Sequence, residues 1–341
     1  MSRQRDWAAY NSSLVARGDL TAWVHDSLFT AWRRQGPQGR PGPRGYSDQA
    51  ILTCLVLGAT FGLRLRQTEG YMRWLLGATG QGDLPVPDYT TLSWRRRRLE
   101  VGLCRPEDKE IFEAARERAG GELVVAVDGT GQVITGPGAW RCHKWGESDE
   151  GQARRRWWRV TTVSDVATGQ IVGMVAEGVD ERAEHEAYGE LMDQAADELG
   201  LPIDKSAADG AYDNRTCYGA ALARGINLVT PPQANATFHL RKARGRRGKL
   251  NAEPGWAGRN RRLASRLRTG GDKAWKAEEG YGRRSLSETV FSRASFAFGD
   301  KLWSKSRQAR KAEVTIGYML LNAWRAAEIT LAGGYTSFEA R

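Results

Sequence analysis

The sequence predicts a mixed α/β protein in which a helical region precedes an α/β domain. Residues 48–62 are mostly apolar and residues 66–76 have apolar residues at helical spacing, which favours packed helices. Residues 123–127 are then continuously apolar and lead into Asp128 and Gly129, a pattern typical of a buried strand. Beyond this run, strand-like and helix-like stretches alternate, as they do in α/β domains. The change of pattern marks a boundary between two kinds of structure.

The charge of the chain indicates a polyanionic partner. Its 341 residues are enough for about two domains. The formal net charge is +11 and the sequence pI is about 9.7. A surface of this sign attracts nucleic acid, so we expect double-stranded DNA to be the partner.

The sequence indicates neither a membrane segment nor a site built from cysteines. The longest apolar run, residues 50–61, is interrupted by small and polar residues and is too short to span a bilayer. The cysteines are far apart and include no CxxC, so neither a zinc site nor a disulfide framework is expected. They are Cys54, Cys104, Cys142 and Cys217. We expect a cytoplasmic, nucleoid-associated protein with no membrane contact and no organic cofactor.

Residues 1–104 are expected to form the helical domain, with a Gly- and Pro-rich linker at residues 36–46. Within this domain, Asp88 is placed to cap a helix over residues 89–99. A charged helix over residues 105–120 is expected to connect this domain to the next one.

The helix after Asp88 begins with hydroxyl residues and ends in four arginines. Three helices with a short, basic last helix resemble a helix-turn-helix module, whose last helix enters the major groove of DNA. The candidate DNA contacts are Thr90, Thr91, Arg95, Arg96, Arg97 and Arg98. The alternative is a solvated charge run at a helix C-terminus, which the helix dipole also favours.

After the connecting helix, the expected order is three strands, a helix, a strand, a helix, a strand, a basic insertion and a helix. A three-strand meander followed by alternating helices and strands is the order of the ribonuclease-H-like α/β fold. We therefore predict this fold for residues 121–232 and 275–332, with the basic insertion at residues 233–274.

Three acids fall where this fold places an active site: on the first strand, at the end of the fourth strand and on a later helix. They are Asp128, Asp209 and Glu288. Carboxylates brought together repel one another, so such a cluster is stable in its ionised form mainly when it holds a cation. Mg²⁺ prefers oxygen ligands, and two such ions can drive a phosphoryl displacement. The acids are therefore predicted to be catalytic residues and ligands of Mg²⁺, with Mn²⁺ expected to substitute.

Two blocks around these acids resemble the DDE transposases of bacterial insertion sequences, and among them the insertion-sequence family five type. One block is Asp-Gly-Ala-Tyr-Asp at residues 209–213, and the other runs from Tyr281 through Arg284 to Glu288. In that family the second block reads tyrosine, two residues, arginine, three residues, glutamate, six residues and lysine. The spacing matches here, except that Ser295 stands at the lysine position.

The resemblance implies a transposase that binds the terminal inverted repeats of its element, cleaves DNA strands and joins the 3′-hydroxyl ends to target DNA. It also implies a homodimer or a larger synaptic assembly, because two ends must be handled together. Tyr281 and Arg284 would contact the DNA. One alternative is a metal-dependent nuclease of the same fold that does not join ends. The other is a transposase-derived DNA-binding regulator, against which the intact acid triad argues.

The insertion is expected to be loop-like, and its arginines predict contact with the DNA backbone unless it is only a solubilising loop. The candidates are Arg244, Arg246 and Arg247, together with Lys144 in an earlier basic segment, where a structural role is the alternative. Trp256 and Trp275 would either stack on unpaired bases or pack the insertion onto the core.

Other acids are given lesser roles. Asp213 is expected to cap a turn or helix rather than to be catalytic. Glu184 and Glu186 are expected to be solvated on a helix.

Overall fold

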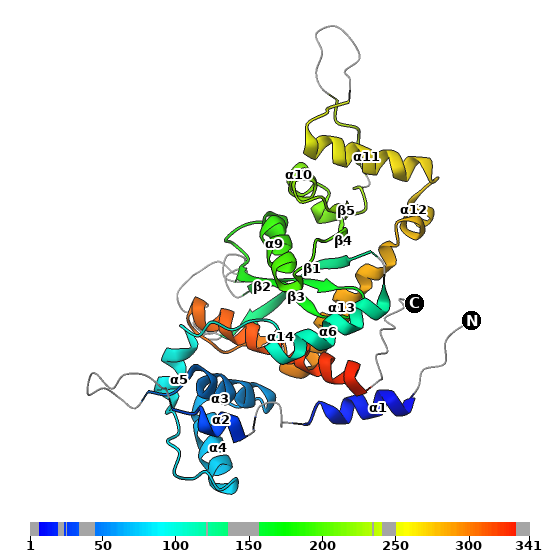
Figure 1. Ribbon diagram of the computed structural model, residues 1–341. Helices are drawn as coiled ribbons and strands as arrows, with labels where there is room; N and C mark the ends of the chain where they lie inside the picture. Colours follow the sequence, from blue (N-terminus) through cyan, green and yellow to red (C-terminus); the bar gives the residue numbers. More distant parts are fainter. Residues whose placement is uncertain are drawn as a thin grey trace, which may run out of the picture. The chain divides into compact units, whose positions relative to one another are not determined.

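The structure is a computed structural model, drawn in Figure 1. It describes residues 7–19, 24, 26–33, 45–120, 122–135, 157–233, 235–240 and 250–331. The chain divides into two units. Unit 1 consists of Met1–Asp108, Val133–Gly136 and Arg293–Gly334, and unit 2 consists of Lys109–Gln132, Pro137–Ser292 and Tyr335–Arg341.

Unit 1 is mainly helical, and its helices begin where the sequence supplies capping side chains. Ser47 accepts a hydrogen bond from the Ala50 amide at 3.0 Å, and the Asp88 carboxylate accepts from the amides of Thr90 and Thr91. The cap predicted at Asp88 is therefore confirmed. The elements are α1 (Trp7–Ala16), α2 (Asp26–Thr30), α3 (Asp48–Thr60), α4 (Leu65–Ala78), α5 (Tyr89–Arg96), β6 (Lys301–Leu302) and α14 (Arg307–Leu331).

The core of unit 1 is built from both ends of the chain. Buried residues of α3, α4 and α5 pack with residues of α14 in one apolar cluster, which also contains Trp32. The contribution of α14 is Ile316, Met319, Leu320 and Ala323. This arrangement differs from the domain boundaries expected from the sequence, which placed residues 275–332 entirely in the catalytic domain. The amphipathic pattern of α14 predicts that one face of the helix is buried, but it does not identify the helices that bury this face.

No single helix among the described residues has the length and apolar character needed to cross a membrane. Helices α3 and α4 meet that criterion only when they are taken together, and they are bent by 108° at the break between them.

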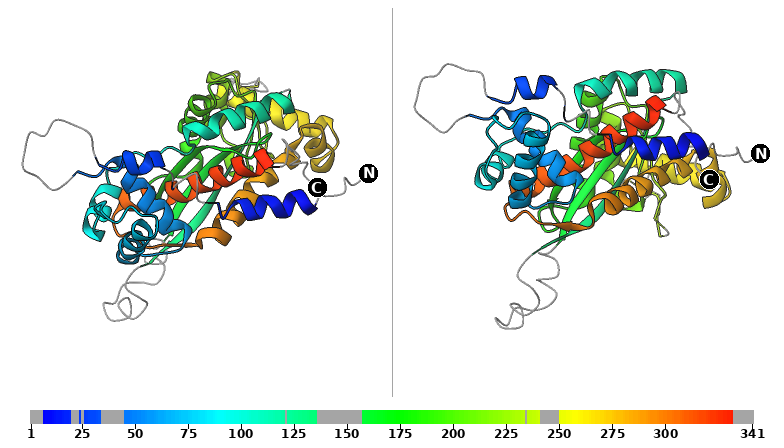
Figure 2. Two further views of the ribbon diagram at one scale, coloured as in Figure 1. Left: turned by 60° about the horizontal axis from the view of Figure 1, so that its bottom comes forward. Right: turned by 90° about the horizontal axis from the view of Figure 1, so that it is seen from below.

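Unit 2 contains a mixed sheet in the order β3-β2-β1-β4-β5. Strands β2 and β3 pair antiparallel, whereas β4 pairs parallel with both β1 and β5. The strands are β1 (Val124–Ile134), β2 (Trp157–Asp165), β3 (Ile171–Gly178), β4 (Lys205–Ala207) and β5 (Asn227–Val229). This order is that of the predicted ribonuclease-H-like fold. Figure 2 shows the strands from two further directions.

Helices and short turns connect the strands of unit 2. They are α6 (Pro106–Ala119), η1 (Glu184–Ala187), α9 (Tyr188–Leu199), η2 (Gly210–Tyr212) and α10 (Arg215–Ala223), followed by η3 (Tyr281–Arg284) and α13 (Ser285–Phe298). The first residues of α6 and the last residues of α13 belong to unit 1.

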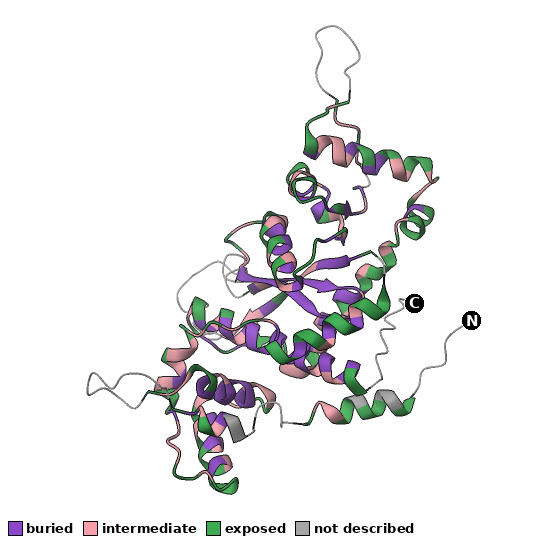
Figure 3. Ribbon diagram, viewed as in Figure 1, coloured by how far each residue is buried: buried purple, intermediate pink, exposed green. Residues whose placement is uncertain are grey.

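Strand β1 is buried on both faces, which explains its continuous apolar run (Figure 3). Val125 and Val127 belong to the cluster that contains the buried residues of α9 and α10. Val124 and Ala126 belong to a second cluster with Leu286 of α13. Because side chains alternate along a strand, Asp128 is expected on the face that Leu286 covers.

The expectation that residues 233–274 are loop-like is wrong. This segment contains α11 (Pro254–Arg268) and α12 (Asp272–Glu278). Pro254 stands at the start of α11, where its missing N–H costs nothing. Helix α11 is rich in arginine and α12 carries two lysines, and each helix has a buried apolar side chain, Leu263 in α11 and Trp275 in α12. The ring of Trp275 lies beside that of Tyr281 in the short helical turn that follows, with centroids 6.0 Å apart.

Candidate active site

Asp128 lies in β1, and two side chains from the segment that carries Glu288 contact its carboxylate. Arg284 Nη1 lies 2.6 Å from Asp128 Oδ2, and Ser287 Oγ lies 2.9 Å from the same oxygen. Ser287 is fully buried beside Leu286, whereas the Asp128 side chain retains 15% of its exposure. The alternation of β1 thus places the first acid against the helix that carries the third acid.

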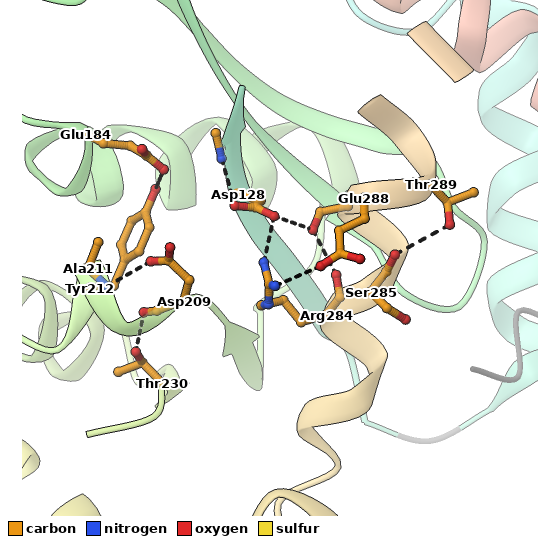
Figure 4. Close-up of polar contacts among 12 residues, drawn as sticks. Asp128, Glu184, Asp209, Ala211, Tyr212, Thr230, Arg284, Ser285, Glu288 and Thr289 are labelled. Carbon is orange, nitrogen blue, oxygen red and sulfur yellow. Dashed lines mark hydrogen bonds and ion pairs between the residues drawn. The ribbon is translucent and has the colours of Figure 1, made fainter. Parts of the chain in front are cut away.

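Glu288 lies on α13, four residues after Arg284, so both side chains project from neighbouring positions. Arg284 Nη2 lies 3.0 Å from Glu288 Oε1, and the guanidinium therefore bridges Asp128 and Glu288 (Figure 4). Burial lowers the pKa of Arg284. The charges of its neighbours raise this pKa by more, so that it lies above its ordinary value; these neighbours are Tyr281, Asp128, Glu288 and Asp209. The arginine is firmly charged and lies in the field of all three predicted acids.

Asp209 comes two residues after β4 and caps η2. Its Oδ1 accepts a hydrogen bond from the Ala211 amide at 2.8 Å, and its carbonyl oxygen accepts one from the Thr230 hydroxyl. These contacts fix the loop at the carboxyl end of the strand. Burial raises the pKa of Tyr281, the charge of Arg284 lowers it, and the charge of Asp209 raises it, so Asp209 and Arg284 both act on this tyrosine.

Glu184 is a fourth acid at this site, and the expectation that it is solvated is wrong. It is half-buried and accepts a hydrogen bond from the Tyr212 hydroxyl at 2.9 Å. Burial raises the pKa of Glu184, and the charges of Asp209 and Asp128 raise it further. A Cβ on Gly129 would lie 2.6 Å from Glu184 Cδ. The glycine that follows Asp128 was the available sequence signal, because it leaves room for an approaching side chain.

Asp213 contacts residues other than these acids. Its side chain is fully buried, and Oδ2 accepts from Arg259 Nη2 at 3.0 Å and from the Gln233 amide at 3.1 Å. Arg259 belongs to α11, so the acid that ends the Asp-Gly-Ala-Tyr-Asp block anchors the insertion. This role differs from the simple cap expected from the sequence.

Several of the predicted DNA-contacting side chains have partners within unit 1. Arg95 pairs with Asp48, and the hydroxyls of Thr90 and Thr91 both contact Asp88. Arg96 is half-buried, and burial lowers its pKa against the opposing charge of Glu313. Arg97 and Arg98 are exposed, with Arg98 lying over the ring of Trp94. Lys144, Arg244, Arg246 and Arg247 lie outside the described residues.

Ser295, at the position of the family lysine, is exposed, and its hydroxyl contacts Asp300. Trp256, the other tryptophan of the insertion, stacks on His239 with ring centroids 3.7 Å apart.

The donor chemistry of the acid cluster fits a hard divalent ion, because every candidate ligand is a carboxylate oxygen. In the described part of the chain, however, no three such side chains converge closely enough to hold an ion. Two of the acids instead share the guanidinium of Arg284. Two carboxylates that are chemically suited to bind a metal ion, Asp128 and Glu288, therefore pair with the guanidinium of Arg284.

The sheet has the strand order of the ribonuclease-H-like fold, with Asp128 on β1, Asp209 after β4 and Glu288 on α13. Sequence comparison identifies the family of the chain. A family profile described as "Transposase DDE domain" matches residues 119–323, and a second profile of the same description matches residues 15–137. The first match covers more than half of the chain, so the protein belongs to the DDE transposase family.

A similar solved structure is titled "Cryo-EM structure of piggyBac transposase synaptic complex with hairpin DNA (SNHP)". The two chains are 9% identical, with a TM-score of 0.41. The similarity covers 96% of this chain and 76% of the other chain.

Proposed function

We propose that this DDE transposase moves an insertion sequence of the family five type. It would bind the terminal inverted repeats of the element, cleave DNA strands and join the 3′-hydroxyl ends to target DNA. The observation that carries this proposal is the pairing of Asp128 and Glu288, 160 positions apart in sequence, around one guanidinium, within the field of Asp209. Such convergence of acids from separate elements suits a site for phosphoryl transfer.

Asp128, Asp209 and Glu288 would hold Mg²⁺ ions, and Mn²⁺ is expected to substitute. When bound, such ions would activate the attacking hydroxyl or water and stabilise the leaving oxygen. Ser287 would orient the Asp128 carboxylate through its buried hydroxyl. The Asp209 loop is held by its bonds to Ala211 and Thr230, which would keep the second acid in place.

DNA binding would use two regions of positive charge. In unit 1, Arg97 and Arg98 have exposed side chains at the end of α5 and are the better candidates of the four arginines there. In unit 2, the exposed arginines of α11 lie in the segment that Asp213 anchors to the active-site loop. Guanidinium groups are suited to bidentate contact with phosphate.

The test is an assay of cleavage and joining on DNA that carries the element ends, with Mg²⁺ and with EDTA. Asp128→Asn, Asp209→Asn and Glu288→Gln should each lower cleavage by at least about a hundredfold, as expected for the loss of a transition-state contact. Each should leave end-binding within about twofold of wild type in a gel-shift assay. Glu186→Gln, an exposed acid on the neighbouring turn, is the control and should cleave normally.

The outcomes separate the alternatives. Cleavage without joining would indicate a nuclease, and end-binding without cleavage in Mg²⁺ would indicate a regulator. Normal cleavage by Glu288→Gln would show that the acid assignment is wrong.

A further inference from the structure

Arg284 occupies a position that is unusual for a DNA-contacting arginine. Its two terminal nitrogens point at two different acids, with Nη1 at 2.6 Å from Asp128 and Nη2 at 3.0 Å from Glu288 (Figure 4). One acid lies on a strand and the other on a helix, so the guanidinium joins the two elements. Only 19% of the arginine side chain is exposed.

The acids need this positive charge when no metal is bound. Asp128 and Glu288 lie on either side of Arg284, and Asp209 is close enough to influence the arginine. Without a counter-charge between them, the carboxylates on either side of Arg284 would repel one another. The guanidinium therefore stabilises the same ionised acids that a metal ion requires.

Arg284 and a metal ion would nevertheless compete for the same oxygen. Asp128 Oδ2 already faces Arg284 and Ser287, which leaves little room for an ion bound at about 2.1 Å. A divalent ion on that oxygen would also repel the neighbouring guanidinium. Binding of an ion through Oδ2 would thus require Arg284 to move away from that oxygen, whereas Oδ1 accepts a hydrogen bond from the Gly129 amide at 3.0 Å.

We propose that Arg284 is the resident counter-cation of the acid pair and that metal binding releases it to contact a DNA phosphate. This inference rests on the proposed metal-dependent function. Before metal binds, the arginine holds Asp128 and Glu288 together. After metal binds, its planar fork is free to form a bidentate phosphate contact beside the acids. Metal and DNA therefore bind with positive coupling, and each tightens the binding of the other.

The first test measures Mn²⁺ binding to the full-length protein without DNA, by electron paramagnetic resonance of the free ion. Arg284→Gln removes the competing cation and should bind Mn²⁺ at least about fivefold more tightly than wild type, the lower end of typical coupling factors. Arg283→Gln removes the same charge from the neighbouring, exposed arginine of η3, and it should stay within about twofold of wild type. Asp128→Asn removes a proposed ligand, so the Mn²⁺ binding that this variant loses defines the binding at the proposed site.

The second test measures DNA binding with Ca²⁺, an oxygen-preferring ion of the same charge, so that affinity can be read without turnover. Ca²⁺ should tighten DNA binding by the wild type at least about fivefold, and this gain should disappear in Arg284→Gln. Arg284→Lys keeps the charge but cannot bridge two acids, so its Mn²⁺ affinity should lie between that of the wild type and that of Arg284→Gln. Arg284→Lys also replaces Arg284→Gln as the test variant if Arg284→Gln does not fold.

The results distinguish this inference from the proposed function. If the wild type does not bind Mn²⁺ at the site defined by Asp128→Asn, the proposed function fails, and the inference fails with it. If the wild type binds Mn²⁺ and neither Arg284 variant binds it more tightly, the proposed function stands and the counter-cation role is wrong. A gain with Ca²⁺ that persists in Arg284→Gln also contradicts the inference.

Discussion

The contacts of Asp213 show that its carboxylate has a structural role. It has no side-chain exposure, and Arg259, 14% exposed, supplies the charge opposite it at 3.0 Å. Removing one partner of a buried pair leaves the other charge without compensation, which costs more than the pair contributes. The pair connects the block that begins with Asp209 to α11, so its loss would loosen the insertion.

Asp213→Asn is therefore expected to lower the free energy of unfolding by about 3 kcal/mol, measured by urea denaturation of the full-length protein. The matched control is Arg268→Gln, which breaks an exposed pair with Glu278 in which the two side chains are 71% and 52% exposed. That change should cost less than about 1 kcal/mol. Equal effects of the two substitutions would show that the Asp213 pair is not buried in solution.

At this scale the sequence predicted the three acids but not their surroundings. Asp128, Asp209 and Glu288 were predicted as the active-site acids from the order of the expected elements and from the spacing of the blocks that resemble the transposases. Glu184 was assigned to solvent because a glutamate near a helix start is usually exposed, and its contact with Tyr212 depends on the packing of η1 against η2. The bridge from Arg284 to Asp128 also joins residues far apart in sequence, which spacing alone does not predict.

At the scale of elements, α5 shows how one side chain defines a helix start. The hydroxyl of Thr90 and the amide of Thr91, with further contacts from both residues, lower the pKa of Asp88 from 3.8 to about 2. Asp88→Ala should destabilise unit 1 by about 1 kcal/mol at pH 7, the usual effect of a lost cap. Thermal unfolding of both proteins would measure the difference.

The pH dependence of that difference has a definite sign. Because the folded pKa lies below the ordinary value, the stabilisation is fully present above about pH 4 and is lost as the pH falls toward 2. The gap between wild type and Asp88→Ala should therefore narrow below pH 4. Asp88→Asn keeps a capping oxygen and should lose much less stability at pH 7. Because asparagine does not titrate, the stability of this variant relative to wild type should rise below pH 4 by the same amount as that of Asp88→Ala. A gap that stays constant down to pH 3 would contradict the cap.

Elements with a clear hydrophobic period were predicted well, and two elements rich in charged residues were not. The strands and the helices of unit 1 follow apolar patterns that the sequence displays directly. Helices α11 and α12 were missed because density of charge was taken to indicate a loop. Arginine, which is frequent in α11, and lysine, which occurs twice in α12, are both good helix formers. The buried apolar positions Leu263 and Trp275 are too few to give a strong hydrophobic period.

At the scale of the whole molecule, the sequence did not show that unit 1 needs both ends of the chain. Its core combines α3, α4 and α5 with four apolar residues of α14. The domain boundary near residue 104 reflected a change of pattern along the chain, and such a change contains no information on long-range packing. The apolar core of the helical region therefore includes residues from near the C-terminus.

A fragment of residues 1–108 is expected to fold poorly, because it lacks Ile316, Met319, Leu320 and Ala323. It should bind a hydrophobic dye and give poorly dispersed amide resonances. The control joins residues 293–331 to this fragment through a flexible linker and should restore cooperative unfolding. Cooperative unfolding of the shorter fragment alone would contradict the assignment of α14 to this core.

The central claim is that Asp128 binds a catalytic metal ion, and a change of metal preference tests it most directly. A thiolate is a poor ligand for Mg²⁺ and a better one for the softer Mn²⁺. Cleavage of element-end DNA by Asp128→Cys and by wild type should be measured in each metal. The account predicts that the ratio of the rate in Mn²⁺ to the rate in Mg²⁺ is at least about tenfold higher for Asp128→Cys than for wild type. An unchanged ratio would contradict direct contact between Asp128 and the metal.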